Sequence, residues 1–253
     1  MLPDGWNKIL DTPVILLNLD TEKTRLSTTV DRTCAAGFRD LCRMHAVDGT
    51  NNLEVSALWN DVHHLPKRPD SLSPHQAGCM LSHLNVWRYI IDNTIPYCVV
   101  LEDDALFHAQ WHSLAPLYYA ATPKTAHMIY MGHHCGNAQP NVHISRVPVF
   151  CTNAYILTFE GACLLYNYIT RNYPYELEAI DVMLVRLQMA ILDSKRGVAN
   201  PQSPSRSSSQ TFEFEWYAWN SEMFPDNDSY ALINPGQVVR DKGLVFQQYK
   251  YDE

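Results

Sequence analysis

Short apolar runs alternate with longer amphipathic runs along the first two thirds of the chain. The runs PVILLNL (13–19) and PYCVVL (96–101) are almost continuously apolar, which is typical of parallel strands covered on both faces. HMIYMG (127–132), a short apolar run that ends in Gly, and NAYIL (153–157), with its aromatic and β-branched residues, are also predicted as strands. Strands that alternate with helices in this way predict an α/β fold with an open, mostly parallel sheet flanked by helices.

The clearest helical pattern covers residues 73–92. It starts with Ser73 as a capping residue, Pro74 at the first helical position and a Gln three residues after the cap. An apolar face at helical spacing follows, made of Ala77, Met80, Leu81, Leu84, Trp87 and Ile91. Two further helices are predicted over about 160–171 and about 179–192.

The periodic texture ends near Val198. A Ser/Pro-rich segment over about 199–211 predicts a polar, flexible loop, and an aromatic C-terminal extension follows over about 212–253. With 46% hydrophobic residues, the chain has enough apolar side chains for the core of one α/β domain. We therefore expect a single domain over residues 1–253.

The chain carries a formal net charge of -8 and has no basic run, which argues against nucleic acid or an anionic membrane as the main partner. No apolar stretch approaches the roughly 20 residues of a membrane span, and the first residues lack the pattern of a signal peptide. The seven cysteines are scattered without a C-x-x-C pair, as expected of reduced thiols. These features predict a soluble, cytoplasmic protein. His133, His134 and Cys135 are adjacent, and adjacent residues rarely converge on one zinc ion.

The stretch VVLEDDALF (99–107) places three consecutive carboxylates, Glu102, Asp103 and Asp104, at the end of a predicted strand. In open α/β sheets, ligands bind beyond the carboxyl ends of the strands. Two carboxylates one residue apart suit Mg²⁺ or Mn²⁺, which takes oxygen ligands and also binds substrate phosphates. The alternative interpretation is an acidic turn or a helix N-terminus, where Asp and Glu are common for electrostatic reasons.

Several segments, in order, resemble glycosyltransferase family 25, the group of lipopolysaccharide β-galactosyltransferases and collagen galactosyltransferases. They are VILLNLDTEKTR (14–25), AVDG (46–49), GCMLSHLNVWRYIIDNTIPYCVVLEDD (78–104), NAYILTFEGACLL (153–165) and AIDVML (179–184). Together they extend over roughly residues 12 to 210. The resemblance implies a Rossmann-like fold of the GT-A type, a nucleotide-sugar donor and a divalent metal.

The resemblance also assigns roles to individual residues. It implies Glu102 and Asp104 as metal ligands and Asp181 as the base that takes the proton of the acceptor hydroxyl. Glu176 and Glu178 are rivals for the role of base, and an Asp at a helix N-terminus also occurs without any catalytic role. Many GT-A enzymes supply a late His to the metal, but no His follows His143 here.

Six residues are implied to contact the nucleotide-sugar donor: Asn18, Leu19, Arg25, Asp48, His83 and Asp103. Three of them have a simpler interpretation as well. Arg25 also fits a solvated helix face, and Asp48 an ordinary Asp-Gly turn. His83 also fits a half-buried His that orients the strand carrying the three carboxylates.

The resulting hypothesis is a metal-dependent, inverting glycosyltransferase that uses Mn²⁺ or Mg²⁺. It moves a hexose, expected to be galactose from UDP-galactose, onto a hydroxyl of a glycan or glycoprotein acceptor. Aromatic residues such as Tyr155, Trp216, Tyr217 and Trp219 are candidates for stacking on acceptor sugars, although aromatic residues of this kind are more often simply part of the core or of an interface. One alternative is a non-catalytic nucleotide-sugar or carbohydrate-binding protein on the same fold. The other is a nucleotide-sugar hydrolase or nucleotidyltransferase. A nucleotidyltransferase would need a Gly-rich phosphate-binding loop after the first strand, and the sequence there has none.

Overall fold

The computed structural model describes residues 1–134, 144–196, 213–220 and 233–235. The predicted loop over 199–211 lies outside these residues, and so does most of the predicted extension over 212–253.

Within the described residues, nine strands form one sheet. They are β1 (Pro13–Asn18), β2 (Asp40–His45), β3 (Tyr97–Glu102), β4 (Ala105–Phe107), β5 (Met128–His134), β6 (Ile144–Ser145), β7 (Phe150–Thr158), β8 (Trp216–Trp219) and β9 (Ile233–Pro235). The main order is β2-β1-β3-β7-β5-β8-β6, and β9 pairs with β4 and β5. The pairings make six of these strands run in one direction, whereas β4, β6 and β7 run in the other. The predicted mostly parallel sheet is therefore confirmed, with the NAYIL strand antiparallel to both of its neighbours.

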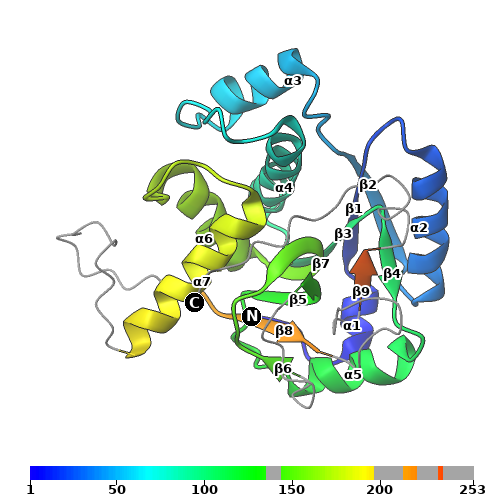
Figure 1. The fold of residues 1–253 in the computed structure, drawn as a ribbon. Coiled ribbons are helices and arrows are strands. Elements are labelled where there is room, and N and C mark those ends of the chain that lie inside the picture. Colours follow the sequence, from blue (N-terminus) through cyan, green and yellow to red (C-terminus); the bar gives the residue numbers. More distant parts are fainter. Residues whose placement is uncertain (135–143, 197–212, 221–232, 236–253) are drawn as a thin grey trace.

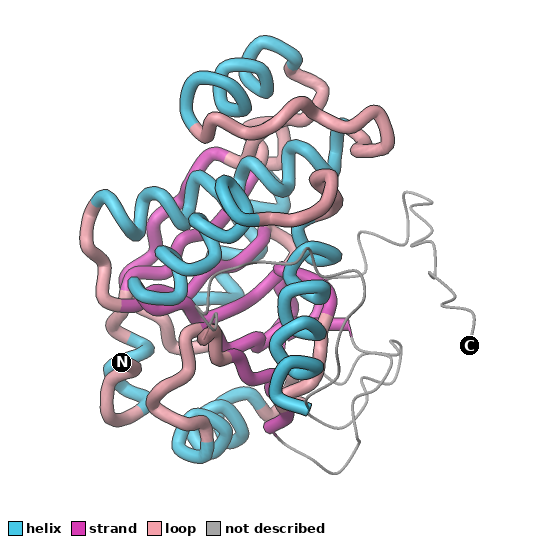
Figure 2. Tube along the Cα trace, turned by 90° about the vertical axis from the view of Figure 1, so that its left-hand side faces the viewer, coloured by secondary structure: helices cyan, strands magenta, loops and turns pink. Residues whose placement is uncertain are grey.

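Helices cover both faces of the sheet (Figure 1). The elements are α1 (Trp6–Leu10), α2 (Lys23–Ala35), α3 (Asn52–Ser56), α4 (Pro74–Asp92), α5 (Trp111–Ala121), α6 (Phe159–Asn167) and α7 (Ile180–Arg196), with π-helical turns η1 (Ala57–Val62) and η2 (Tyr168–Asn172). One face carries α4, α6 and α7, and the other carries α1, α2 and α5. Figure 2 shows the strands between these two layers. The predicted α/β class is thus confirmed.

The strand β1 shows why its sequence is almost continuously apolar. Ile15 and Leu17 pack into the core beneath α4, α6 and α7, whereas Val14 and Leu16 pack into the core beneath α1, α2 and α5. Successive side chains of a strand point to opposite faces, so a strand covered on both sides needs apolar residues at every position. The prediction from the apolar run is confirmed.

The helix α4 begins as its sequence predicts. The Ser73 hydroxyl accepts a hydrogen bond from the backbone N–H of Gln76 at 3.3 Å, and the Gln76 side-chain oxygen accepts one from the backbone N–H of Ser73 at 3.0 Å. The helices predicted over 160–171 and 179–192 correspond to α6 with η2 and to α7. In the described part of the chain, no helix is both long enough and apolar enough to cross a membrane.

The segment AVDG, after β2, packs closely on α4. A Cβ atom at Gly78 would lie 2.6 Å from the carbonyl oxygen of Val47, and one at Gly49 would collide with the carbonyl oxygen of Pro74. The Ser82 hydroxyl accepts a hydrogen bond from the backbone N–H of Val47 at 2.8 Å. Glycine at both positions lets the loop approach the helix backbone, and this contact holds the loop beside the ends of β1 and β3.

Three of the four aromatic residues suggested for stacking on acceptor sugars are in the core. Tyr155, Trp216 and Trp219 are each 0% exposed. They lie on strands inside the sheet, where large aromatic side chains fill the space between the layers. The stacking role suggested for these three is wrong for this structure, and Tyr217 is the one of the four that keeps partial exposure.

Candidate active site

The three carboxylates lie at the carboxyl end of β3, next to the carboxyl end of β1. Leu17 of β1 is paired with Glu102 of β3, so Asn18 comes beside the Asp103–Asp104 turn. Asp103 is 7% exposed and Asp104 is 9% exposed, whereas Glu102 is half-buried. Three negative charges at one buried strand end are unfavourable unless cations or hydrogen-bond donors stabilise them. The three carboxylates differ in the donors and cations that contact them.

Asp103 is the best compensated by cationic and amide groups. It forms an ion pair with Arg25 of α2 and accepts a hydrogen bond from the Asn18 amide at 2.7 Å. Its backbone carbonyl accepts a hydrogen bond from the Thr29 hydroxyl at 2.6 Å, which ties the turn to α2. Burial raises the pKa of Asp103, while Arg25 and Asn18 act in the opposite direction.

The amide of Asn18 is itself held in one orientation. The Nε atom of Arg43 on β2 donates to the Asn18 side-chain oxygen at 3.0 Å, so the Asn18 nitrogen is the atom that faces Asp103. Arg43 also donates to the Asn18 backbone carbonyl at 3.1 Å and pairs with Asp20. Arg43 is therefore part of the site, and its contact was missing from the sequence prediction.

Glu102 is held by hydroxyl and imidazole groups. Its Oε1 atom lies 3.2 Å from His83 Nε2, and it accepts a hydrogen bond from the Thr152 hydroxyl at 3.2 Å. Although burial acts to raise the pKa of Glu102, its interactions with His83 and Thr152 bring that pKa below its usual value. Glu102 therefore carries a negative charge at neutral pH.

Asp104 is left with little compensation. Among the described residues, the Arg25 guanidinium lies 3.8 Å from the Oδ2 atom of Asp104, and the buried Oδ1 atom has no hydrogen-bond partner. Burial, followed by the charge of Glu102, raises the pKa of Asp104 to about 7. The Nε atom of Arg25 is also buried without a partner. This corner of the site therefore has the properties of a place for a cation with oxygen ligands.

A cavity of about 230 Å³ opens beside these carboxylates. All six residues predicted to contact the donor line it, together with Glu102: Asn18, Leu19, Arg25, Asp48, His83 and Asp103. The structure thus brings together residues from three separate segments of the sequence. Asp104 and Asp181 are not among the residues that line this cavity.

Asp181 lies in the first turn of α7 and is partly buried. Burial raises its pKa, and the charge of Glu102 acts in the same direction. The carboxylates of Asp181, Glu102 and Asp104 all act, after burial itself, to raise the pKa of the thiols of Cys79 and Cys151. The three carboxylates therefore lie around the same pair of half-buried cysteines, so Asp181 is near the carboxylate cluster.

The rival bases are placed differently. Glu178 receives two hydrogen bonds from Arg186, at 2.5 and 2.9 Å, and one from the Tyr173 hydroxyl at 2.7 Å. These partners lower the pKa of Glu178 against the opposing effect of burial. Glu176 is exposed to solvent. A carboxylate engaged by Arg186 and Tyr173 is poorly suited to take a proton, so Asp181 is the better placed of the three.

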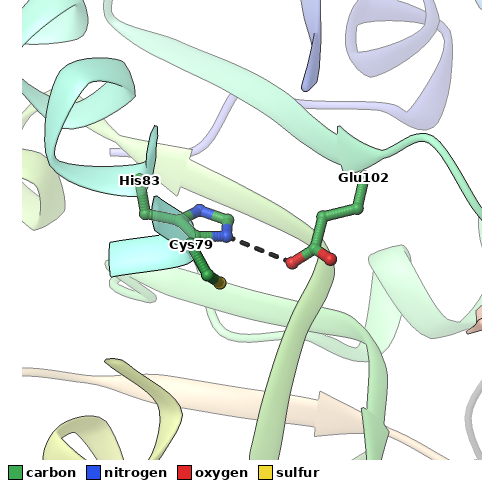
Figure 3. A group of neighbouring side chains, drawn as sticks. All are labelled: Cys79, His83 and Glu102. Atoms are coloured by element: carbon green, nitrogen blue, oxygen red, sulfur yellow. Dashed lines mark hydrogen bonds and ion pairs between the residues drawn. The ribbon is translucent and has the colours of Figure 1, made fainter. Parts of the chain in front are cut away.

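One group in the site has the composition of a metal site without having been predicted as one. Among the described residues, Cys79 and His83 of α4 and Glu102 of β3 offer three potential ligand atoms within 4.8 Å of one another (Figure 3). Of the three adjacent residues considered for zinc, His133 has its Nε2 atom 3.1 Å from the backbone carbonyl oxygen of Trp219, and the side chains of His134 and Cys135 lie outside the described residues.

Comparison with known proteins identifies sequence relatives. A family model described as "Glycosyltransferase family 25 (LPS biosynthesis protein)" matches residues 11–141. Procollagen galactosyltransferase 2 of Mus musculus is 31% identical to this chain over 118 residues, and the Homo sapiens protein is 29% identical over the same length. Each alignment covers 44% of this chain and 18% of the relative, so the match spans less than a fifth of the relatives' length.

Two solved structures match most of this chain, with TM-scores below 0.5. One is involved in glycosylation of the major capsid of PBCV-1; it is 10% identical, with a TM-score of 0.41, and the match covers 92% of this chain and 98% of that one. Another is a mutant of Drosophila β1,4-galactosyltransferase 7 in complex with manganese, UDP-Gal and xylobiose. It is 12% identical, with a TM-score of 0.41, and the match covers 94% of this chain and 77% of that one.

Proposed function

This chain belongs to glycosyltransferase family 25, and we propose that it is a metal-dependent, inverting glycosyltransferase. It moves a hexose, with galactose from UDP-galactose as the expected donor, onto a hydroxyl of a glycan or glycoprotein acceptor. One observation carries the proposal: a single cavity is lined by all six residues predicted to contact the donor and by Glu102 of the carboxylate cluster. The choice of galactose is supported by the galactosyltransferase relatives.

The residues present fit a divalent cation. Within the part of the chain that the structure describes, the buried Oδ1 atom of Asp104 has no hydrogen-bond partner, and the Arg25 guanidinium is 3.8 Å from this carboxylate. We assign Glu102 and Asp104 as the protein ligands of Mn²⁺ or Mg²⁺, both of which favour oxygen ligands. When bound, the ion neutralises the donor diphosphate and stabilises it as a leaving group.

The residues of the cavity bind and orient the donor. Asn18 and Leu19 lie at the end of β1, where backbone groups can pair with the edge of a uracil, and Arg25 faces the diphosphate. The Asp48 side chain accepts hydrogen bonds from the backbone N–H of Thr50 at 2.9 Å and its hydroxyl at 2.7 Å, both through Oδ1. This fixes Asp48 at the rim of the cavity, where we propose that it contacts the ribose.

Asp103 and His83 act closer to the metal ligands. Asp103 holds Arg25 in the cavity and hydrogen-bonds the donor ribose or sugar. Both ring nitrogens of His83 are engaged, one by Tyr155 and one by Glu102. We therefore give His83 the orienting role rather than a direct contact with the donor.

The chemical step is a substitution at the anomeric carbon. The acceptor oxygen attacks that carbon from the face opposite the diphosphate, the bond between the carbon and the diphosphate oxygen breaks, and Asp181 takes the hydroxyl proton. The raised pKa of Asp181 suits a general base, because proton transfer is most efficient when the pKa of the base is near the working pH. Attack from the opposite face yields a β-linkage from an α-linked donor.

The direct test is a panel of UDP-sugars and other nucleotide sugars, with and without Mn²⁺. We expect metal-dependent thermal stabilisation by UDP-sugars, and slow Mn²⁺-dependent hydrolysis of the preferred donor. The Asp104→Asn variant is the control and should lose both effects. If no nucleotide sugar responds in the presence of metal, the proposal is wrong. Metal-dependent UDP binding without turnover of any donor would instead support a binding protein on this fold. A cytoplasmic location remains our expectation from the scattered cysteines.

A further inference from the structure

A chain of buried polar groups extends from α4 through β7 to Glu102. The indole N–H of Trp87 donates to the Tyr155 hydroxyl oxygen at 3.0 Å, and this hydroxyl lies 2.9 Å from Nδ1 of His83. The other ring nitrogen of His83, Nε2, lies 3.2 Å from Oε1 of Glu102, as drawn in Figure 3. Trp87 and Tyr155 are each 0% exposed, and His83 is 1% exposed. Water is therefore excluded from the first three members of the chain.

The direction of each hydrogen bond in this series follows from the indole N–H of Trp87, where the series begins. An indole N–H is only a donor, so the Tyr155 oxygen must accept from Trp87. The hydroxyl still has one hydrogen to donate, and among the described residues its other polar contact is His83 Nδ1. A buried hydroxyl without an acceptor would lose the free energy of a hydrogen bond. Nδ1 of His83 is thus the acceptor, and the ring hydrogen is on Nε2, which donates to Glu102.

We propose that Tyr155 is a positioning residue: its hydroxyl fixes the tautomer of His83 so that Nε2–H holds the carboxylate of Glu102 in place at the donor cavity. The Thr152 hydroxyl donates to the same Oε1 atom, so the hydrogen bonds from described residues leave Oε2 of Glu102 available to a ligand. The consequence for metal binding rests on the proposed function, in which Glu102 is a metal ligand. The proton order itself does not depend on it.

The same geometry argues against a second metal ion at Cys79, His83 and Glu102. Their ligand atoms lie within 4.8 Å of one another, but a metal ligated by His83 Nε2 needs the lone pair that carries the hydrogen in this tautomer. Moving the ring hydrogen to Nδ1 would direct it at the Tyr155 oxygen, and the Tyr155 hydrogen would then lose its acceptor. The His83–Glu102 contact drawn in Figure 3 is therefore the end of the series of hydrogen bonds that begins at Trp87.

Tyr155→Phe removes the hydroxyl and keeps the ring in the core. Nδ1 of His83 then loses its hydrogen-bond partner, and the ring is held only through Nε2–H and Glu102. A ring fixed at one nitrogen can rotate, so Glu102 is held less firmly in its position. Losing an outer partner of a metal ligand typically lowers metal affinity by about 10- to 100-fold. We expect a loss of Mn²⁺ affinity of about tenfold, because Thr152 still holds Oε1.

Tyr130→Phe is the matched control. Tyr130 is paired with Tyr155 across β5 and β7, is 0% exposed, and its hydroxyl accepts a hydrogen bond from Gln188 at 2.9 Å. The control therefore removes the same kind of buried, hydrogen-bonded hydroxyl from the next strand without touching His83. Tyr130→Phe should bind Mn²⁺ as tightly as the unmodified protein does. This should hold even if its unfolding temperature falls by as much as that of Tyr155→Phe.

The proton order is tested first, on the unmodified, metal-free protein. Long-range ¹H–¹⁵N NMR spectra distinguish a ring nitrogen that carries hydrogen from one that does not, and the His83 signals are those missing from His83→Gln. We expect hydrogen on Nε2 alone. Hydrogen on Nδ1, or on both nitrogens, at neutral pH would overturn the proposal. So would a thiolate-to-cobalt charge-transfer band on adding Co²⁺ that disappears in Cys79→Ser, because it would show a metal bound at Cys79 rather than at an exposed thiol such as Cys34 or Cys42.

Mn²⁺ titration, with free ion followed by electron paramagnetic resonance, tests the consequence. Tyr155→Phe should bind about tenfold more weakly, and the double variant Tyr155→Phe/His83→Ala should bind as weakly as His83→Ala alone, because Tyr155 acts through His83. Unchanged affinity in Tyr155→Phe would refute the positioning role. If the unmodified protein binds no Mn²⁺, the proposed function fails instead, and the NMR result still decides the proton order.

Discussion

Replacing Asp104 by Asn should stabilise the metal-free protein, although it removes a proposed metal ligand. Asp104 is buried, its Oδ1 atom has no hydrogen-bond partner among the described residues, and its pKa is raised to about 7 from an ordinary value of 3.8. The folded state therefore holds a proton that the unfolded state has already released between these two pH values. Stability falls as pH rises through this window, and the loss is complete above about pH 7.

The size of the effect follows from the same two values. They are about three pH units apart, and each unit corresponds to about 1.4 kcal/mol, so charging Asp104 in the folded protein costs up to about 4 kcal/mol. Asn is neutral at every pH and avoids this cost. The realised gain is smaller, because the substitution also removes the 3.8 Å contact with Arg25. At roughly 2–4 °C per kcal/mol for a chain of this size, we expect a melting temperature several degrees higher.

The assay is thermal unfolding in EDTA at about pH 5 and about pH 8, followed by circular dichroism. The advantage of Asp104→Asn should be larger at the higher pH, since most of the cost arises between about pH 5 and pH 7. The matched control is Asp92→Asn, which removes an exposed carboxylate paired with Arg88 and should change little. Adding Mn²⁺ at the higher pH should raise the melting temperature of the unmodified protein but not that of Asp104→Asn. An advantage that is absent, or equal at both pH values, would refute the reasoning.

Three further predictions follow from the same site and its supports. In steady-state assays, Asp181→Asn should lower kcat at least about 100-fold, as loss of a general base does. Glu178→Gln should keep most of the activity. The reverse result would identify Glu178 as the base. Gly78→Ala should lower the free energy of unfolding in urea by about 1–3 kcal/mol, because the new Cβ would lie 2.6 Å from the Val47 carbonyl oxygen; an unchanged midpoint would contradict the close packing. Removing divalent ions with EDTA should abolish UDP binding in calorimetry, and re-added Mn²⁺ should restore it.

The sequence predicts the central strands well and the sheet edge poorly, for physical reasons. The strands β1 and β3 are covered on both faces, so their apolar runs carry a strong signal. The strand β2, DLCRMH, has no fully buried residue, and so its sequence lacks both an apolar run and a clear alternation. The direction of β7 depends on which strands it pairs with, and the NAYIL pattern contains no information about direction.

The candidate site divides in a similar way. The carboxylates and the residues around the cavity belong to short motifs that can be recognised locally. The residues that hold them do not: Thr29 contacts the Asp103 carbonyl across 74 positions, Thr152 contacts Glu102 across 50, and Tyr155 contacts His83 across 72. A Thr or Tyr whose partner is that distant in sequence has no spacing pattern, so only the fold reveals its role.

The structure also answers why three carboxylates stand together at one strand end. Arg25 compensates Asp103, while His83 and Thr152 hold Glu102. Asp104 receives no comparable group, and the burial that isolates it raises its pKa to about 7. One arginine is therefore insufficient for the cluster, and the uncompensated charge is concentrated on a single residue. A cation that binds there recovers the free energy that folding loses at Asp104, so metal binding and stability are coupled through this one side chain.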